Sequence, residues 1–306
     1  MKSQLLFSLL LIVKLSLGQQ HKVVYENEKD SSQNYYIIDL PKDTIKGLLV
    51  LNARILSDSS KMTASRLGIC TLTIVPTTNH LDNLASSSIL NAIDRMIGEV
   101  IHTYKISNTN IIIGGMSVAG TGSLRYAEFC YLNRSKYGIK PCAVFGVDPP
   151  LDYERLYNES HRAVIRNFSK DAVDESRILM EILSRNLNGT PQTNLKSYQK
   201  NSPFCYSAIN GGNAYLLNNL AVRLYTEPDI IWWIANRRKD YYDINSIDVA
   251  ALINQLKLNG NTNAELIATE NKGVRIDGHP HSWSIVDEQD LLLWCNKIFR
   301  NSNNRK

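Results

Sequence analysis

Along most of the chain, short continuous apolar runs alternate with longer stretches in which apolar residues recur three or four positions apart. Runs of the first kind predict strands, and stretches of the second kind predict amphipathic helices. Strands are predicted at 21–26, 35–40, 46–53, 69–76, 109–115, 142–149, 220–229 and 264–271. Helices are predicted at 57–67, 83–104, 123–138 and 287–299.

The order of these segments predicts an α/β fold. From residue 46 onward strands and helices alternate, which implies right-handed crossovers and a mostly parallel, doubly wound sheet with helices on both faces. The first strands have no helix between them, so we expect an antiparallel edge. Residues 151–215 are too long for a plain crossover, and we interpret them as a helical insertion, or lid. No repeat or low-complexity linker divides residues 19–306, which predicts one domain.

The first 18 residues differ from the rest. Lys2 precedes an apolar run from Leu5 to Leu17, and Gly18 supplies a small residue, a pattern typical of a secretory signal peptide. The run is short for a membrane span. We therefore expect a secreted or periplasmic protein without stable membrane insertion after cleavage. An uncleaved anchor and a buried N-terminal helix are the alternatives.

Composition narrows the classes of partner and cofactor. Cleavage of the predicted signal peptide would remove Lys2 and Lys14, so the formal net charge falls from +5 to +3. The remaining basic residues are scattered along the chain. This gives no basis for a nucleic-acid partner. The five cysteines form no CxxC motif and no Cys/His pair at metal spacing. The sequence therefore predicts neither a metal site nor a bound cofactor.

The stretch "IIIGGMSVAGTGSLRYAE" (111–128) joins a buried strand to a helix through small residues. Two interpretations fit it. The turn either serves packing alone, or it presents Ser117 as a nucleophile. A nucleophile turn requires nearly side-chain-free positions two residues before and after the serine, and Gly115 and Ala119 meet that requirement.

Reactive residue types follow three of the predicted strands, at the edge where a doubly wound sheet places its site. Ser117, Asp229 and His281 occur there in the order Ser, Asp, His, which is the order of the G-x-S-x-G hydrolases. His279 is the alternative base. The alternative carboxylates for the acid are Asp148, Glu227, Asp240, Asp243 and Asp248.

These segments and "GHPHSWSIVD" (278–287) resemble the α/β-hydrolase superfamily, and more narrowly its secreted bacterial esterase-like members, over about residues 21–300. Esterases similar to S-formylglutathione hydrolase carry the catalytic histidine in a His-x-Trp context, which His281-Ser282-Trp283 matches. The resemblance implies a serine hydrolase that cleaves a small-molecule or glycan ester through an acyl-serine. It implies Ser117 as nucleophile, His281 as base and Asp229 as the acid that orients it.

The oxyanion hole departs from the family pattern. One donor is expected at the backbone N–H of Val118, and the second near Arg54, in a loop that lacks the usual glycine. Losing one such donor costs about 3–4 kcal/mol of transition-state stabilisation. The loop without glycine, together with Ala119, suggests a non-catalytic, hydrolase-like binding protein as one alternative function. A serine peptidase of the same fold, with residues 151–215 as a gating lid, is the other, because the same triad serves both hydrolases.

Overall fold

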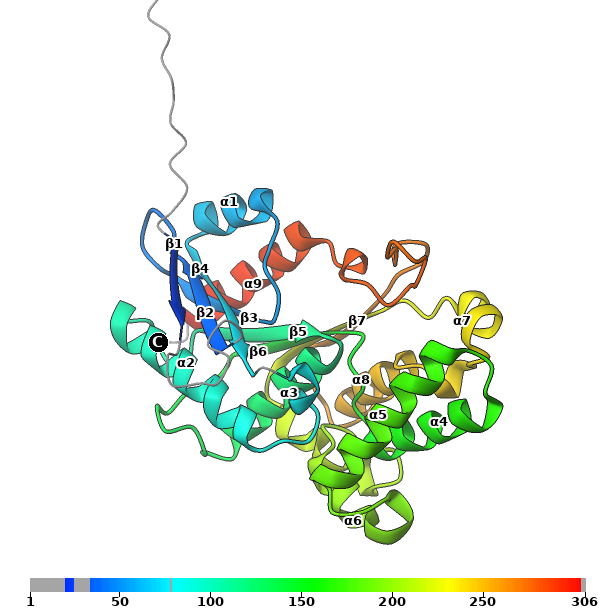
Figure 1. Cartoon of the computed structure of the whole chain (residues 1–306). Helices are drawn as coiled ribbons and strands as arrows, with labels where there is room; N and C mark the ends of the chain where they lie inside the picture. The colour runs from blue at the N-terminus through cyan, green and yellow to red at the C-terminus, as the bar shows by residue number, and fades with distance from the viewer. Residues whose placement is uncertain (1–19, 25–33, 78, 304–306) are drawn as a thin grey trace, which may run out of the picture.

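The computed structural model describes residues 20–24, 34–77 and 79–303 (Figure 1). The segment expected to be a signal peptide lies outside the described residues. Within the described ranges, no helix has the length and apolar character needed to cross a membrane. The strands are β1 Gln20–Val24, β2 Asn34–Asp39, β3 Gly47–Asn52, β4 Ile69–Pro76, β5 Ile111–Met116, β6 Ala143–Val147, β7 Ala221–Thr226 and β8 Ala264–Ala268.

Helices occupy most of the chain between these strands. The α-helices are α1 Asp58–Leu67, α2 Ser88–Tyr104, α3 Ser117–Tyr131, α4 Tyr153–Arg166, α5 Lys170–Asn186, α6 Pro191–Asn201, α7 Ile230–Arg237, α8 Ser246–Leu258 and α9 Glu288–Asn303. The 3-10 helices are η1 His80–Asn83, η2 Ile209–Leu217, η3 Tyr241–Asp243 and η4 Trp283–Ile285.

The eight strands form one sheet in the order β1-β2-β4-β3-β5-β6-β7-β8. β2 runs antiparallel to both of its neighbours, whereas β4, β3 and β5 to β8 are mutually parallel. The predicted fold class and antiparallel edge are both confirmed. Because all parallel strands point the same way, their carboxyl ends meet at one edge of the sheet.

The core lies in two layers, one on each face of the sheet. Leu48 and Val50 of β3 pack with α2, α3 and α8, whereas Leu49 and Leu51 pack with α1 and α9. This alternation follows from the two-residue period of a strand. Since both faces are covered, the strand reads as an unbroken apolar run.

A third apolar cluster lies under the helices of the segment 151–201. It joins Tyr153 and Leu156 of α4 to Leu179 of α5, and it includes Val118 at the start of α3. The Tyr153 hydroxyl donates a hydrogen bond to the Leu84 carbonyl beside η1. Figure 1 shows these helices, in green, grouped together at one side of the sheet.

Two predicted helices begin at different residues in the structure. The helix expected from residue 123 begins at Ser117, and it is buried on nearly every side from Val118 to Glu128. Tertiary packing thus outweighs the low helix propensity of Gly120 and Gly122. The helix expected from residue 83 is preceded by η1, and α2 begins only at Ser88.

Candidate active site

Ser117 lies in a strained turn between β5 and α3. Its φ is 53°, in the left-handed region that costs a residue with a side chain about 1–2 kcal/mol. A Cβ on Gly115 would lie 2.9 Å from the Ala119 carbonyl carbon, and one on Gly120 would lie 2.7 Å from the Gly115 oxygen. Both glycines are therefore required for the turn to close. Strain maintained in this way is typical of functional sites.

His281 contacts a carboxylate at the end of β6. Its Nδ1 lies 2.6 Å from Oδ2 of Asp148, and the two side chains are 17% and 7% exposed. Since Nδ1 faces Asp148, Nε2 is the ring nitrogen left to receive a proton from another group. This arrangement orients an imidazole as a general base.

Asp148 is itself held by residues at the end of β7 and at the start of α8. Its Oδ1 accepts a hydrogen bond of 2.8 Å from the Thr226 hydroxyl at the end of β7. Its backbone carbonyl accepts one of 3.0 Å from Asn245. The Thr226 hydroxyl also lies 2.7 Å from that of Ser246. The carboxylate is therefore fixed toward the imidazole before any ligand binds.

The structure places Asp148, and not Asp229, against His281. Asp229 is exposed and caps α7, where its Oδ1 accepts from the Trp232 backbone N–H at 3.2 Å. β7 ends at Thr226, and the chain turns into α7 before it can present Asp229 to the imidazole. The signal for Asp148 is present in the sequence, because this residue directly follows an apolar strand, as Ser117 does.

The other carboxylates considered for the acid have structural partners. Asp243 pairs with Arg162 and Arg166, and Asp248 pairs with Arg155. Asp240 caps η3, where it accepts from the Tyr242 backbone N–H at 2.9 Å. These contacts tie α4 to η3 and α8, so the roles of these carboxylates lie in packing.

Glu227 secures the loop that carries His281. Its buried carboxylate accepts hydrogen bonds from the backbone N–H groups of Lys272 and Gly273 at 2.8–3.1 Å. A Cβ on Gly273 would lie 2.1 Å from the Pro280 oxygen, so only glycine permits this approach. The loop is thereby pinned next to the residue before His281.

His279 supports His281 rather than contacting the acid. The backbone N–H of His281 donates to Nδ1 of His279 at 3.1 Å. The His279 ring lies between Trp232 and Trp233, with ring centroids 4.5 and 4.7 Å away. Burial, and secondarily the neighbouring His281 imidazole, lowers the pKa of His279 to about 4. His279 is therefore a neutral hydrogen-bond acceptor near pH 7.

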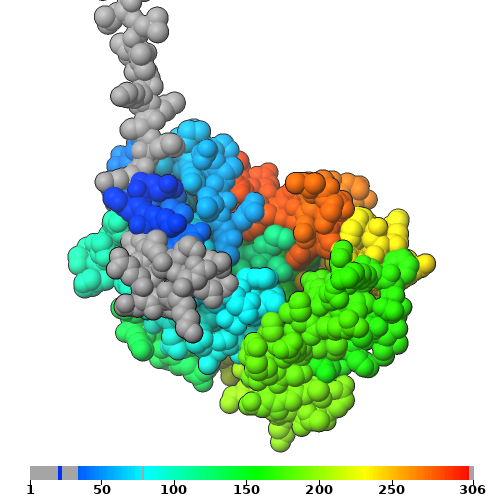
Figure 2. All heavy atoms as spheres, viewed as in Figure 1, coloured from blue at the N-terminus to red at the C-terminus, as the bar shows by residue number. Residues whose placement is uncertain are grey.

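One cavity of about 420 Å³ is lined by Ser117, Val118, Asp148 and His281 together. Its walls come from α4, α5, α7 and the loop of residues 275–281. Figure 2 shows the molecular surface hollowed between the green helices and the orange C-terminal segment. The carboxyl-end site predicted from the sequence thus corresponds to a cavity.

Val118, one of the two residues predicted to form the oxyanion hole, lines this cavity. Its backbone N–H belongs to the first turn of α3, where no intrahelical acceptor is available. Arg54 is placed differently. Its carbonyl accepts from the Thr73 hydroxyl at 2.8 Å, and its guanidinium lies 4.9 Å from the centroid of the Trp283 ring. His80 and Leu81 of η1 line the cavity instead.

A buried ion pair also lines the cavity. Nζ of Lys239 lies 3.0 Å from Oε2 of Glu159, and both residues are less than a tenth exposed. Burial raises the pKa of Glu159, while the charge of Lys239 acts in the opposite direction. The wall contributed by α4 is therefore polar and charged at this point, although Leu156 on the same helix is apolar.

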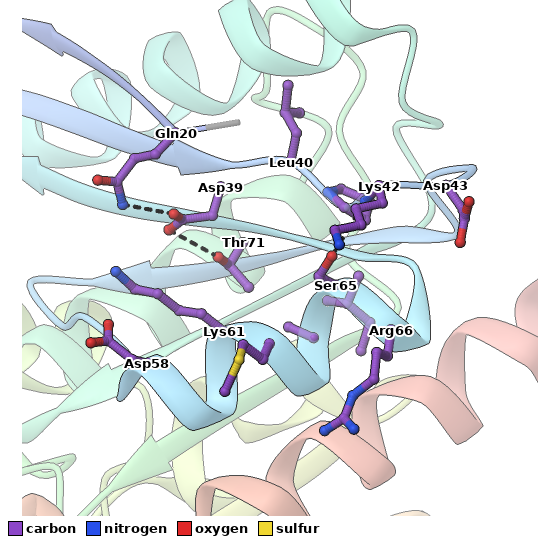
Figure 3. Close-up of a pocket in the computed structure, with 14 residues that line it drawn as sticks. Gln20, Asp39, Leu40, Lys42, Asp43, Asp58, Lys61, Ser65, Arg66 and Thr71 are labelled. Carbon is purple, nitrogen blue, oxygen red and sulfur yellow. Dashed lines mark hydrogen bonds between the residues drawn. The ribbon is translucent and has the colours of Figure 1, made fainter. Parts of the chain in front are cut away.

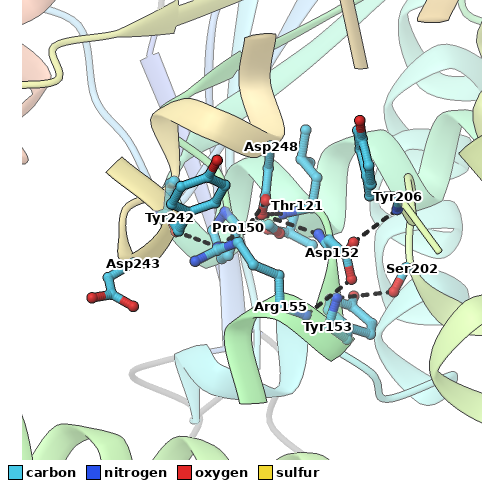
Figure 4. Close-up of polar contacts among 12 residues, drawn as sticks. Thr121, Pro150, Asp152, Tyr153, Arg155, Ser202, Tyr206, Tyr242, Asp243 and Asp248 are labelled. Carbon is cyan, nitrogen blue, oxygen red and sulfur yellow. Dashed lines mark hydrogen bonds and ion pairs between the residues drawn. The ribbon is translucent and has the colours of Figure 1, made fainter. Parts of the chain in front are cut away.

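The one described group with metal-like spacing is Asp152, Glu154 and Cys205, whose ligand atoms lie within 4.8 Å of one another. Asp152 already accepts from the backbone N–H groups of Arg155 and Tyr206 (Figure 4). Burial raises the pKa of Cys205 to about 12, so its thiol is protonated. These donors do not fit a metal centre.

Another cavity, of about 470 Å³, lies between α1 and strands β2 and β4 (Figure 3). It is lined by the start of β4, at Ile69 and Thr71, and by Asp39, which accepts from Gln20 at 2.6 Å. Ile69 is at the amino end of β4, so this cavity lies at the edge of the sheet opposite the carboxyl ends.

Solved structures of hydrolases share the overall fold of this chain. Esterase B from Lactobacillus rhamnosis is 11% identical and covers 94% of this chain and 89% of its own, with a TM-score of 0.55. A fungal esterase from Rhizomucor miehei is 12% identical and covers 94% and 86%, with a TM-score of 0.55.

An acylaminoacyl peptidase from Pyrococcus horikoshii is 13% identical and covers 96% of this chain but 42% of its own, with a TM-score of 0.54. No family model and no curated protein sequence matches the chain. The chain has the α/β-hydrolase fold, as the sequence predicted.

Proposed function

We propose that this protein is a serine hydrolase that cleaves carboxylic esters. The observation that carries the proposal is the hydrogen-bonded pair of His281 and Asp148, which shares one cavity with the strained Ser117 turn. The esterase neighbours support the same class of reaction through their common fold. The proposed triad is Ser117, His281 and Asp148.

In the proposed reaction, Nε2 of His281 takes the proton of the Ser117 hydroxyl as the serine oxygen bonds to the ester carbonyl carbon. The N–H of Val118 stabilises the oxyanion that forms. The imidazolium then gives its proton to the departing alcohol, which leaves an acyl-serine. A water molecule, deprotonated by the same nitrogen, releases the acid and restores Ser117. Asp148 stabilises the imidazolium in both halves of the reaction.

We propose that the helices α4 and α5 act as the lid that shapes substrate choice. They contribute Leu156, Glu159 and Leu179 to the cavity, so one wall offers both apolar and charged contacts. A wall of this kind fits a small-molecule or glycan ester better than a long aliphatic chain. Shortening of the acyl group should then change KM less than removal of polar groups from the alcohol.

Labelling with a fluorophosphonate probe tests the proposed nucleophile. The wild-type protein should form a covalent adduct on Ser117, and Ser117→Ala should form none. Ser123→Ala is the matched control, because Ser123 is a buried serine on the same helix. Equal labelling of wild-type protein and Ser117→Ala would refute Ser117 as the nucleophile. Absence of turnover, together with binding of a glycan or peptide that Ser117→Ala leaves unchanged, would favour a non-catalytic binding protein.

A substrate panel separates the two hydrolase functions. Short p-nitrophenyl esters should be turned over in a manner that depends on Ser117, whereas N-acylated peptides should not. The reverse pattern would assign the site to a serine peptidase.

We further propose that the protein is exported, on the strength of the leader-like residues 1–18. The mass of the mature chain from its native host tests this. An N-terminus near Gln19 supports export, and an intact Met1 in the cytoplasmic fraction contradicts it.

A further inference from the structure

A buried asparagine joins β3 to the nucleophile turn. Asn52, the last residue of β3, is 1% exposed, and its backbone pairs with Gly115 of β5. Its Nδ2 donates to the carbonyl of Ala119 at 3.0 Å and to Oδ1 of Asn83 at 2.9 Å. Ala119 is the second residue after Ser117, so the hydrogen bond from Asn52 holds the turn that presents the serine.

A second buried asparagine continues the contact into η1. Asn83 is 1% exposed, and its Nδ2 donates to the His80 carbonyl at 2.9 Å. The carbonyl oxygens of Ala119 and His80 can only accept, so each must face an Nδ2 group. This fixes the orientation of both amides. We call Asn52 and Asn83 the amide relay.

The amide relay determines how the two sides of the cavity face each other. Ser117 and Val118 line one side of the cavity, which Asn52 contacts at Ala119. His80 and Leu81 line the other side, where Asn83 donates to the His80 carbonyl. The contact is tight, because a Cβ on Gly122 would lie 2.3 Å from Oδ1 of Asn83. The two amide hydrogen bonds therefore hold η1 against the turn, together with Arg125 of α3, which donates to the carbonyls of Asn83 and Ser86.

The amide relay is not the choice that stability alone would favour. Within the described part of the chain, Oδ1 of Asn52 has no hydrogen-bond partner although the residue is buried. An unsatisfied buried acceptor destabilises a fold. A polar group kept in such a place indicates a requirement for geometry.

We propose that Asn52 and Asn83 are positioning residues, which hold η1 against the nucleophile turn so that the oxyanion side of the cavity is formed before substrate binds. This inference rests on the proposed serine hydrolase activity. It also explains how the site forms without a glycine in the loop near Arg54, since the wall beside Val118 comes from η1.

The test compares Asn52→Leu and Asn83→Leu with wild type, using p-nitrophenyl acetate and the fluorophosphonate probe. Misplacement of a catalytic wall by about 1 Å costs roughly a hundredfold in rate. We expect kcat and the labelling rate to fall roughly tenfold to a hundredfold, with little change in KM. Ala119 stays satisfied in Asn52→Leu, because its carbonyl also accepts from the Ser123 hydroxyl at 2.8 Å.

Tyr126→Phe is the matched control. It removes a buried hydrogen bond of 2.8 Å to Asp94 from the same helix, α3, at a point beyond the amide relay. Its thermal stability should fall while kcat is unchanged. If the relay variants behave like this control, losing stability but keeping kcat, the inference is wrong and the relay is only structural.

Three further outcomes separate the amide relay from the proposed function. If neither leucine variant folds, Asn83→Ser removes the amide with a smaller side chain, and unchanged kcat in that variant overturns the inference. Wild-type protein that neither labels nor turns over ester refutes the proposed function itself. Wild-type labelling with equal labelling of the folded relay variants refutes only the amide relay.

Discussion

Replacement of Asp148 by asparagine should abolish most of the proposed ester hydrolysis, whereas the same change at Asp229 should not. The Asp148 carboxylate contacts the imidazole at 2.6 Å and is 7% exposed, whereas Asp229 is exposed at the start of α7. Asp148→Asn keeps the shape of the side chain. It removes the negative charge and changes the ring tautomer that the site favours.

The contact geometry gives the size of the effect. Opposite unit charges with centres about 4 Å apart attract by about 4 kcal/mol at an effective dielectric constant of about 20. At about 1.36 kcal/mol per tenfold in rate, loss of this attraction in the transition state lowers kcat about a thousandfold. The wrong tautomer adds to this loss, and an acid-to-amide change in a serine protease triad costs about 10⁴.

The assay is kcat for p-nitrophenyl acetate with Asp148→Asn, Asp229→Asn and wild type, each shown to be folded by circular dichroism. Asp229→Asn should stay within about threefold of wild type, because asparagine also caps helices well. A thousandfold loss in Asp229→Asn together with an active Asp148→Asn would refute the assignment of the acid. Activity in both would show that His281 needs no carboxylate.

Three other variants follow from the same site. Thr226→Val removes the 2.8 Å hydrogen bond that orients Asp148. A hydrogen bond to a charged group contributes about 1.5–3 kcal/mol, so kcat in the ester assay should fall roughly ten- to a hundredfold. Gly273→Ala places a Cβ 2.1 Å from the Pro280 oxygen, so thermal melting should show a marked loss of stability and turnover should fall with it. His279 stays neutral down to about pH 4 in the folded protein, whereas in the unfolded chain it takes up a proton near pH 6.5. Stability should therefore fall by at most about 3 kcal/mol as pH drops through that window, and urea titrations of His279→Gln should show a flatter pH dependence.

The sheet could be predicted from the sequence because its strands are buried on both faces and its helices are amphipathic. The sequence also predicted that Ser117 and His281 follow strands whose carboxyl ends meet at one edge, and both residues line one cavity there. The catalytic roles of the two residues stay predictions.

The acid could not be chosen from the sequence because several carboxylates follow strands, and the choice depends on where each side chain points. Asp148 and Asp229 differ in one physical respect. Asp148 leaves β6 at once with a φ of 48°, while Asp229 is separated from β7 by two residues and enters a helix. The position of η1 could not be predicted for a similar reason, because its contact with α3 depends on long-range hydrogen bonds made by Asn52 and Arg125.

Ser117 and Asp148 each follow their strand directly, and the last residues of those strands, Met116 and Val147, are paired in register. Adjacent strands lie about 4.8 Å apart, so the backbone spacing of the proposed nucleophile and the proposed acid is set by the sheet itself. His281 instead lies on the loop between β8 and η4, which is held by hydrogen bonds from Lys272 and Gly273 to Glu227. The position of the proposed base therefore depends on loop contacts rather than on the sheet. Hydrogen exchange should be faster in this loop than in β5 and β6, and it should slow in the loop when an acyl-serine forms.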